Sequence, residues 1–200
     1  TSMAATVVTD NNKVKFGLSN VHYAVLTEAV SEGVRTISYG TPKPIPGAVN
    51  LNIQPEGDLT PFRADNIDYW VGGGNNGYSG DVEFARITDE FKVDCLGEAV
   101  DATTTGLQYE VATAQPVAFA LLFEFEGDAK HTRHVLYNCK AGRPTIASET
   151  TPDGNIEPIT ETLSITAKPR STDSLVKAKS VVGDTSYATF FSAVVVPTVA

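Results

Sequence analysis

The sequence predicts a mainly β fold of the α+β class: a β-sandwich or barrel-like domain with one flanking helix and a long extended loop arm. Three observations predict it: two-residue hydrophobic alternation along most of the chain, one stretch with signals for both ends of a helix, and a glycine-, proline- and aromatic-rich segment at residues 54–80. The chain has 200 residues, of which 42% are hydrophobic and 20% charged, so it can bury a substantial core. We expect residues 1–200 to form a single domain that includes the arm.

Alternation of apolar and polar residues predicts the strands. Residues 49–54 read Val-Asn-Leu-Asn-Ile-Gln and residues 162–167 read Thr-Leu-Ser-Ile-Thr-Ala, as expected for strands with one buried face. Residues 117–126 are apolar on both faces for most of their length, which is typical of a central strand. A turn at residues 127–128 and a returning strand at residues 131–139 complete a predicted hairpin. Shorter strands are predicted at residues 21–26, 35–39, 67–71, 81–87, 107–111 and 175–179.

One helix is predicted at residues 89–96. Thr88 can cap its start, two acidic residues follow in the first turn, and Gly97 is a natural stop. Phe91 and Cys95 are four residues apart, so one face of the helix can pack on the sheet. A second short helix is predicted around residues 186–191.

The segment at residues 54–80 is predicted to be an arm. It contains two prolines, a glycine-rich run at residues 72–77 that we interpret as a hairpin tip, and four large aromatic side chains: Phe62, Tyr69, Trp70 and Tyr78. Loops of this length are usually functional, and exposed aromatic side chains need a surface that covers them. We therefore predict an arm that projects and buries these four side chains on another subunit. The alternative is a surface loop packed on its own domain.

The charge balance argues against nucleic-acid binding as the function. The chain has 15 basic and 24 acidic residues, a net charge of −9, whereas affinity for nucleic acid comes mainly from Lys and Arg contacts to phosphate. Cys95 and Cys139 are too few for a disulfide framework and form no CxxC pair, so reduced thiols in a cytosolic product are expected. We expect no membrane span and no signal peptide, and we interpret residues 1–2, before Met3, as a remnant of an expression tag.

No motif in the sequence predicts catalytic, metal-binding or cofactor-binding residues, so we expect a protein that is not an enzyme. His131 and His134 would point to opposite faces of a strand, which makes them a poor metal pair. Glu124 and Glu126 resemble a glycosidase carboxylate pair only in spacing, and they lie beside a predicted turn where solvated acids are expected. The glycine run at residues 72–77 lacks the Gly-Lys-Ser/Thr ending of a phosphate-binding loop.

Several segments in one order resemble a known family. They are YGTP at 39–42, PGAVNLNIQP at 46–55, DNIDYW at 65–70, NNGYSGD at 75–81, FALLFEFEGD at 119–128, TRHVLYNC at 132–139, Arg-Pro at 143–144 and Glu-Thr-Leu at 161–163. In these segments, which cover about residues 14–180, the chain resembles the major tail proteins (tail tube proteins) of siphophages, the long non-contractile-tailed bacteriophages, that infect Gram-positive bacteria.

This resemblance implies a structural virion protein that assembles into hexameric rings. The rings would stack into a tail tube around a tape-measure protein, meet tail terminator and distal tail proteins at the ends, and later conduct DNA without binding it specifically. The expected location is the virion tail, and the host cytoplasm during assembly. A head-to-tail interface can close laterally into a ring while a second one propagates along the axis, and paired sheet edges would be protected from aggregation.

The acidic excess and the implied conduit role together predict a negatively charged channel wall. Its candidate residues are Asp81, Glu83, Glu124 and Glu126. The alternative is that these acids only solvate the outer surface. An alternative function is a host- or carbohydrate-binding β-sandwich module that uses the aromatic residues of the arm as a ligand platform and stays monomeric. An enzyme of unfamiliar type would instead show a deep pocket with convergent polar groups.

Overall fold

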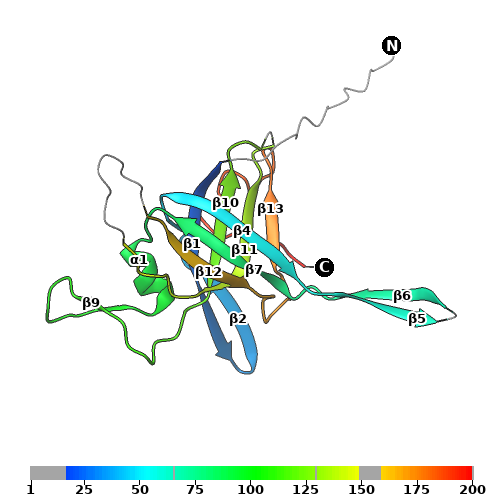
Figure 1. Cartoon of the computed structure of the whole chain (residues 1–200), viewed down its shortest axis with the longest axis horizontal. Helices are drawn as coiled ribbons and strands as arrows, with labels where there is room; N and C mark the ends of the chain where they lie inside the picture. The colour runs from blue at the N-terminus through cyan, green and yellow to red at the C-terminus, as the bar shows by residue number, and fades with distance from the viewer. Residues whose placement is uncertain (1–16, 65, 129, 149–158, 200) are drawn as a thin grey trace, which may run out of the picture.

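The computed structural model describes residues 17–64, 66–128, 130–148 and 159–199, and along residues 59–64 and 67–72 it describes the backbone alone. The fold is mainly β, with 45% of residues in strands, as the alternation predicted (Figure 1). The strands are β1 Leu18–Ser31, β2 Val34–Tyr39, β3 Lys43–Pro44, β4 Ala48–Glu56, β5 Leu59–Ala64, β6 Ile67–Gly73, β7 Gly77–Phe84, β8 Ala99–Val100, β9 Gln108–Tyr109, β10 Phe119–Phe125, β11 Arg133–Ala141, β12 Glu161–Ala167 and β13 Lys177–Ser180.

Nine of these strands form one antiparallel sheet that folds over on itself. Its order is β2-β1-β10-β11-β12-β7-β4, with β13 beside β11 and β3 beside β1. Strand β11 makes the corner: Arg133–Leu136 pair with β13, whereas Cys139–Ala141 pair with β12. A bulge in the pairing of β10 with β11 lies between these two parts. The sheet does not close, so the body is sandwich-like.

The main core lies between the two halves of the folded sheet. Side chains at every second position of β10 face inward from one half, and those of β7 and β12 face inward from the other. Buried examples are Phe119 and Leu121 on β10, Val82 on β7, and Leu163 and Ile165 on β12. The alternation in the sequence therefore identified the inward-facing residues of β10 and β12, whereas for β7 it predicted a strand without assigning its faces.

The predicted helix is confirmed, in a modified form. Helix α1 (Asp89–Phe91) continues as a wider π-helical segment, η1 (Lys92–Leu96). The Phe91 amide donates to the Thr88 hydroxyl oxygen at 3.3 Å, and Gly97 ends the segment with a φ of 84°. The Phe91 ring packs edge-on against Tyr23 and Phe119, so the helix covers one end of the core.

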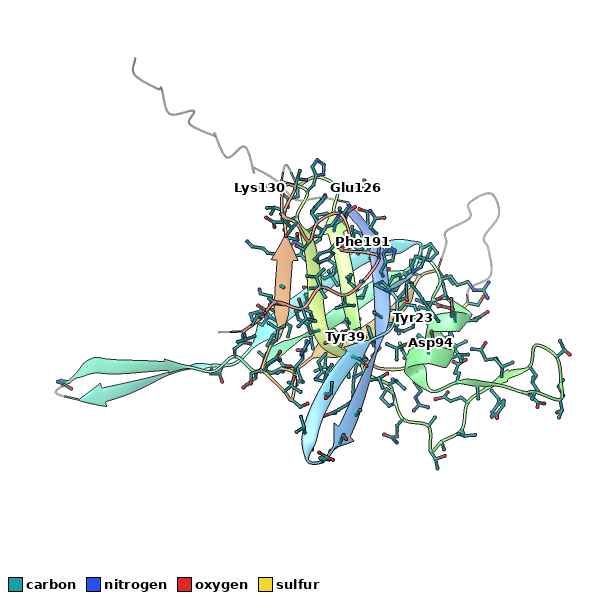
Figure 2. All side chains as sticks on the ribbon, turned by 180° about the vertical axis from the view of Figure 1, so that it is seen from behind. Tyr23, Tyr39, Asp94, Glu126, Lys130 and Phe191 are labelled. Carbon is teal, nitrogen blue, oxygen red and sulfur yellow. The ribbon has the colours of Figure 1, made fainter. Side chains whose placement is uncertain are left out.

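The residues after β13 pack on the body without forming a helix. Residues 186–191 form successive turns, so the predicted second helix is wrong. Phe190 and Phe191 instead cover the outer face of β1, β10 and β11, where Figure 2 shows Phe191 beside the sheet. This second apolar cluster makes the sheet of that half buried on both faces, as predicted for residues 117–126.

Three paired elements leave the body (Figure 1). The distal part of the β1–β2 hairpin extends one way, and its tip carries Val30 and Val34, 63% and 65% exposed. The β5–β6 hairpin and the β8–β9 flap (defined as residues 98–111) leave at opposite ends of the longest axis. β5 with β6, and β8 with β9, form separate two-stranded sheets.

Candidate assembly surfaces

The predicted arm is present as a β-hairpin, which corrects the expectation of an extended loop. Strands β5 and β6 pair from Leu59↔Gly73 to Ala64↔Ile67, so the tip lies between Ala64 and Ile67. The glycine run at residues 72–77 therefore forms the base of the arm, and its interpretation as a hairpin tip is wrong. Strand β5 was not predicted.

The arm carries three of the four aromatic residues proposed for subunit contact. Phe62 lies on β5 opposite Trp70 of β6, with Tyr69 next to it along the strand, and the side chains of these three lie outside the described part of the structure. Tyr78 lies instead on β7, in the body, where its half-buried ring packs against the core. The Lys177 ammonium lies 4.7 Å from the centre of that ring.

Two glycines make the base of the arm possible. Gly57 has a φ of 130°, and a Cβ there would lie 1.8 Å from the Gly74 carbonyl oxygen. Gly77 has a φ of 102°, and a Cβ there would lie 1.9 Å from the Ala167 carbonyl oxygen. Any other residue would push these backbones apart, so glycine is required where the arm leaves the sheet.

The outer face of β4, β7 and β12 is a flat polar surface, which we call the polar face. Three side chains from each strand point outward, and none of the nine is buried or basic. They are Asn50, Asn52 and Gln54 on β4, Ser79, Asp81 and Glu83 on β7, and Thr162, Ser164 and Thr166 on β12. Two carboxylates among uncharged hydrogen-bonding groups give this face a negative potential.

The four acids predicted to line a channel do not share one surface. Asp81 and Glu83 lie on the polar face, and the Thr160 hydroxyl donates to Glu83. Glu124 lies on the opposite outer face of the body, at the end of β10, since it shares a side of that strand with Ala120 and Leu122. Glu126 is exposed beyond the end of β10, as Figure 2 shows.

Glu124 holds the C-terminal residues in place through Arg133. Its carboxylate accepts from Arg133 Nε at 3.0 Å, with both side chains more than 80% buried. The other end of the same guanidinium donates to the Tyr187 carbonyl oxygen and lies 3.8 Å from the Tyr187 ring centre and 4.7 Å from that of Phe191. This largely buried ion pair therefore joins the sheet to the C-terminal segment that covers it.

A groove opens between the two halves of the sheet, close to the base of the arm. It holds about 310 Å³ and is lined by Leu51, Asn52 and Ile53 of β4, Tyr78 of β7, Phe123 and Phe125 of β10, His134, Val135 and Leu136 of β11, and Lys177 and Ala178 of β13. Most of the lining side chains are apolar or aromatic, and Asn52, His134 and Lys177 are its polar members. Lys179 lies outside the lining and points to the same side of β13 as Lys177.

Titratable groups in the core have structural roles. The Tyr23 hydroxyl donates to Asp94 at 2.8 Å, and the Lys43 ammonium lies 2.6 Å from the same carboxylate, which fastens η1 to the sheet (Figure 2). Burial raises the pKa of the Cys95 and Cys139 thiols to about 12, so both are neutral at physiological pH. Both are buried free thiols.

Among the described residues, no group of three or more His, Cys, Asp or Glu side chains is placed to hold a metal ion. His131 lies in the turn before β11 with a φ of 47°, and His134 stacks on Phe123 with ring centres 5.3 Å apart. The described helices include none long and apolar enough to cross a membrane. A scan of protein-family models found no match to this chain, and a search of curated proteins found no significant similarity.

Two surfaces were missed by the sequence analysis. The β8–β9 flap exposes Leu107, Tyr109 and Val111, and the tip of the β1–β2 hairpin exposes two valines. Apolar residues at alternate positions predicted strands in both regions, but alternation alone does not distinguish a strand buried in the body from one that projects. Only the pairing partners of the strands make that distinction.

Proposed function

We propose that this chain is a structural virion protein, the tail tube subunit of a long, non-contractile bacteriophage tail, and that it self-assembles into stacked hexameric rings. The observation that carries the proposal is the β5–β6 hairpin, which pairs only with itself within the described part of the chain and stands away from the body (Figure 1). A two-stranded hairpin alone in water is marginally stable, so this one is suited to packing on another molecule.

The arm is the element that joins neighbouring rings. Burial of one large aromatic side chain contributes about 2–3 kcal/mol, so Phe62, Tyr69 and Trp70 together can dominate axial stacking. Tyr78 lies in the body, next to the base of the arm, and packs against the core. The tape-measure protein occupies the lumen during assembly, and terminator and distal tail proteins cap the two ends.

The polar face lines the channel in this proposal, with Asp81 and Glu83 as its charged groups. DNA that moves through a tube must make few phosphate contacts, because each Lys or Arg contact adds affinity that slows it. Carboxylates repel the duplex within about 8–10 Å at physiological salt, and the uncharged side chains add no cationic site. Glu124 and Glu126 lie elsewhere and are not part of this wall.

Deletion of residues 58–75 tests the proposal. Glu56 and Gly77 are paired across β4 and β7, so the deletion leaves Gly57-Asn76 as a two-residue turn between paired strands. Gly-Asn is a favourable sequence for such a turn, and the body should therefore fold. Wild-type protein should form rings and tubes in negative-stain micrographs, whereas the deletion variant should stop at rings or monomers with an unchanged circular dichroism spectrum.

Other outcomes would contradict the proposal. If the wild-type protein stays monomeric at every concentration and binds glycans, the chain is a host- or carbohydrate-binding module. If the deletion variant forms tubes as readily as wild type, the arm does not join rings. The proposal assigns the chain no catalytic role and no cofactor.

A further inference from the structure

The β8–β9 flap presents an apolar edge to solvent. Leu107, Tyr109 and Val111 recur at every second residue and are 51%, 46% and 49% exposed. Asp101 lies opposite Leu107, whose carbonyl oxygen accepts from the Asp101 amide. Residues 98–111 contain three acidic residues and no basic one. Glu110 is paired with Arg143 at 3.0 Å, so Asp101 is the carboxylate beside the apolar edge. An exposed apolar edge on a small two-stranded element is typical of a surface that another molecule covers.

The groove beside the base of the arm has the complementary chemistry. Its floor is formed by Phe123, Phe125 and Leu136, and its outer wall is the short strand β13. Lys177 of β13 lines the groove, and Lys179 points to the same side of the strand, paired with His134 of the lining, so one cation lies in the groove and a second lies next to it. β4, on the other wall, pairs only with β7 among the described strands, which leaves one of its edges open.

The flap and the groove lie on different parts of the molecule. The groove is lined by strands of the body beside the base of the arm, and Figure 1 shows the arm and the flap leaving the body at opposite ends of the longest axis. The two surfaces therefore cannot meet within one copy, but they can meet between copies in the same orientation. A contact between unlike surfaces of identical chains is head-to-tail and closes into a ring when the rotation permits.

We propose that the flap of one copy seats in the groove of the next, as the lateral contact that closes each ring. Leu107, Tyr109 and Val111 cover the apolar rings of the groove, and Asp101, on the same side of the flap as Leu107, lies toward Lys177 and Lys179. The groove accepts an apolar edge against Phe123 and Leu136 and a carboxylate beside Lys177. This inference rests on the proposed function, since it names the contact by which copies join.

Disulfide trapping tests the contact directly. The double variant L107C/K179C places one thiol on the flap and one at the groove, and the native Cys95 and Cys139 are buried. Mild oxidation should link successive copies into a ladder that ends at the ring, whereas each single variant can form only dimers. The matched control is V34C/K179C, in which the first thiol lies on the equally exposed β1–β2 tip.

The outcomes separate this inference from the proposed function. A ladder from L107C/K179C and none from the control supports the contact. Rings in the wild-type micrographs with no ladder, or with a ladder of equal strength from the control, overturn the contact and leave the tube proposal standing. A wild-type protein that never forms rings, together with no ladder, overturns both.

Charge reversal provides an independent measurement. The K177E/K179E variant should raise the protein concentration needed for ring formation about tenfold, because it places acidic groups against the acidic flap. Lys140→Glu is the matched control, since Lys140 is an exposed lysine on β11 outside the groove lining. Equal ring formation by all three proteins would contradict the proposed contact.

Discussion

The two outer faces of the body differ in polarity and in whether the chain covers them. The face of β1, β10 and β11 is apolar, with Ala120 and Leu122 among its side chains, and the chain's own C-terminal residues cover it. The polar face on the other side is left uncovered by the described part of the chain, and its nine outward side chains are all polar. An apolar sheet face needs a cover, whereas a polar one can stay in water and remain free for a wet channel.

The C-terminal residues that cover the apolar face form no strand or helix. Side-chain contacts therefore hold them on the sheet. The Tyr137 hydroxyl donates to the Val195 carbonyl oxygen at 2.5 Å. The Tyr39 hydroxyl donates to the backbone carbonyl oxygen of Tyr137 at 3.0 Å. Phe190 supplies the buried contact, at 2% exposure. Most of the stabilisation at this face must therefore come from a few side chains, and each should be costly to remove.

The largest expected effect is at Phe190. Phe190→Ala should lower the free energy of unfolding by about 3–4 kcal/mol, because it removes a fully buried ring and leaves a cavity over the sheet. Urea unfolding measures this change. Thr162→Ala, on the polar face, is the control and should change it by less than about 0.5 kcal/mol. Equal small effects from both variants would mean that the two faces do not differ as described.

A smaller, pH-dependent effect is expected at Tyr137. Burial, aided by neighbouring Tyr39 and Asp173 and opposed by Arg170, raises its pKa above the usual value. The neutral phenol is favoured in the folded state, so this stabilisation is fully present below about pH 10 and is lost as the pH rises further and the unfolded chain ionises. Tyr137→Phe should cost about 1 kcal/mol at pH 7 through the lost hydrogen bond.

Measuring the stability of wild type and Tyr137→Phe as a function of pH makes this test specific for the Tyr137 hydroxyl. The stability advantage of wild type over Tyr137→Phe should shrink between about pH 9 and 11, as measured by urea midpoints in that range (about one unit either side of the usual tyrosine pKa). A constant difference across this range would show that the hydroxyl is not held neutral under the C-terminal segment.

Much of the fold follows from local sequence rules. The Thr88 and Gly97 signals placed the helix, and alternation placed the strands of the body to within a few residues. Strand β5 was missed because residues 59–64 contain Pro61 and lack alternation. The segment around residues 186–191 was predicted to be a helix and forms turns instead, because a buried face needs no regular structure when side chains hold it.

The assignment of the acids to surfaces shows where strand-by-strand reasoning stops. Asp81 and Glu83 alternate with Val82 and Phe84, which indicates a polar outer face, whereas Glu124 follows Ala120 and Leu122 on an apolar one. That difference is present in the sequence. Which outer faces become neighbours, however, depends on the partner change of β11 at its bulge, and long-range pairing of this kind leaves no local signal.

The smallest expected effect on stability, and the sharpest test of the polar face, comes from adding positive charge to it. Thr162 and Ser164 are exposed and lie opposite Glu83 and Asp81, outside the groove lining, so T162K/S164K should change the free energy of unfolding by less than about 0.5 kcal/mol. In tubes, however, each ring would gain a band of lysines facing the DNA. We expect assembled variant tubes to retain duplex DNA at low salt and to release it as salt rises, because each lysine–phosphate contact releases counterions.

Wild-type tubes should retain none. The matched control is a double variant with lysines on the opposite half of the body, T27K/S38K on the paired and exposed β1–β2 hairpin. Co-sedimentation of labelled DNA with the tubes measures the difference. If the control retains DNA inside the tube and T162K/S164K does not, the polar face lies on the outside of the assembly, and this exposed polar surface serves solubility rather than passage.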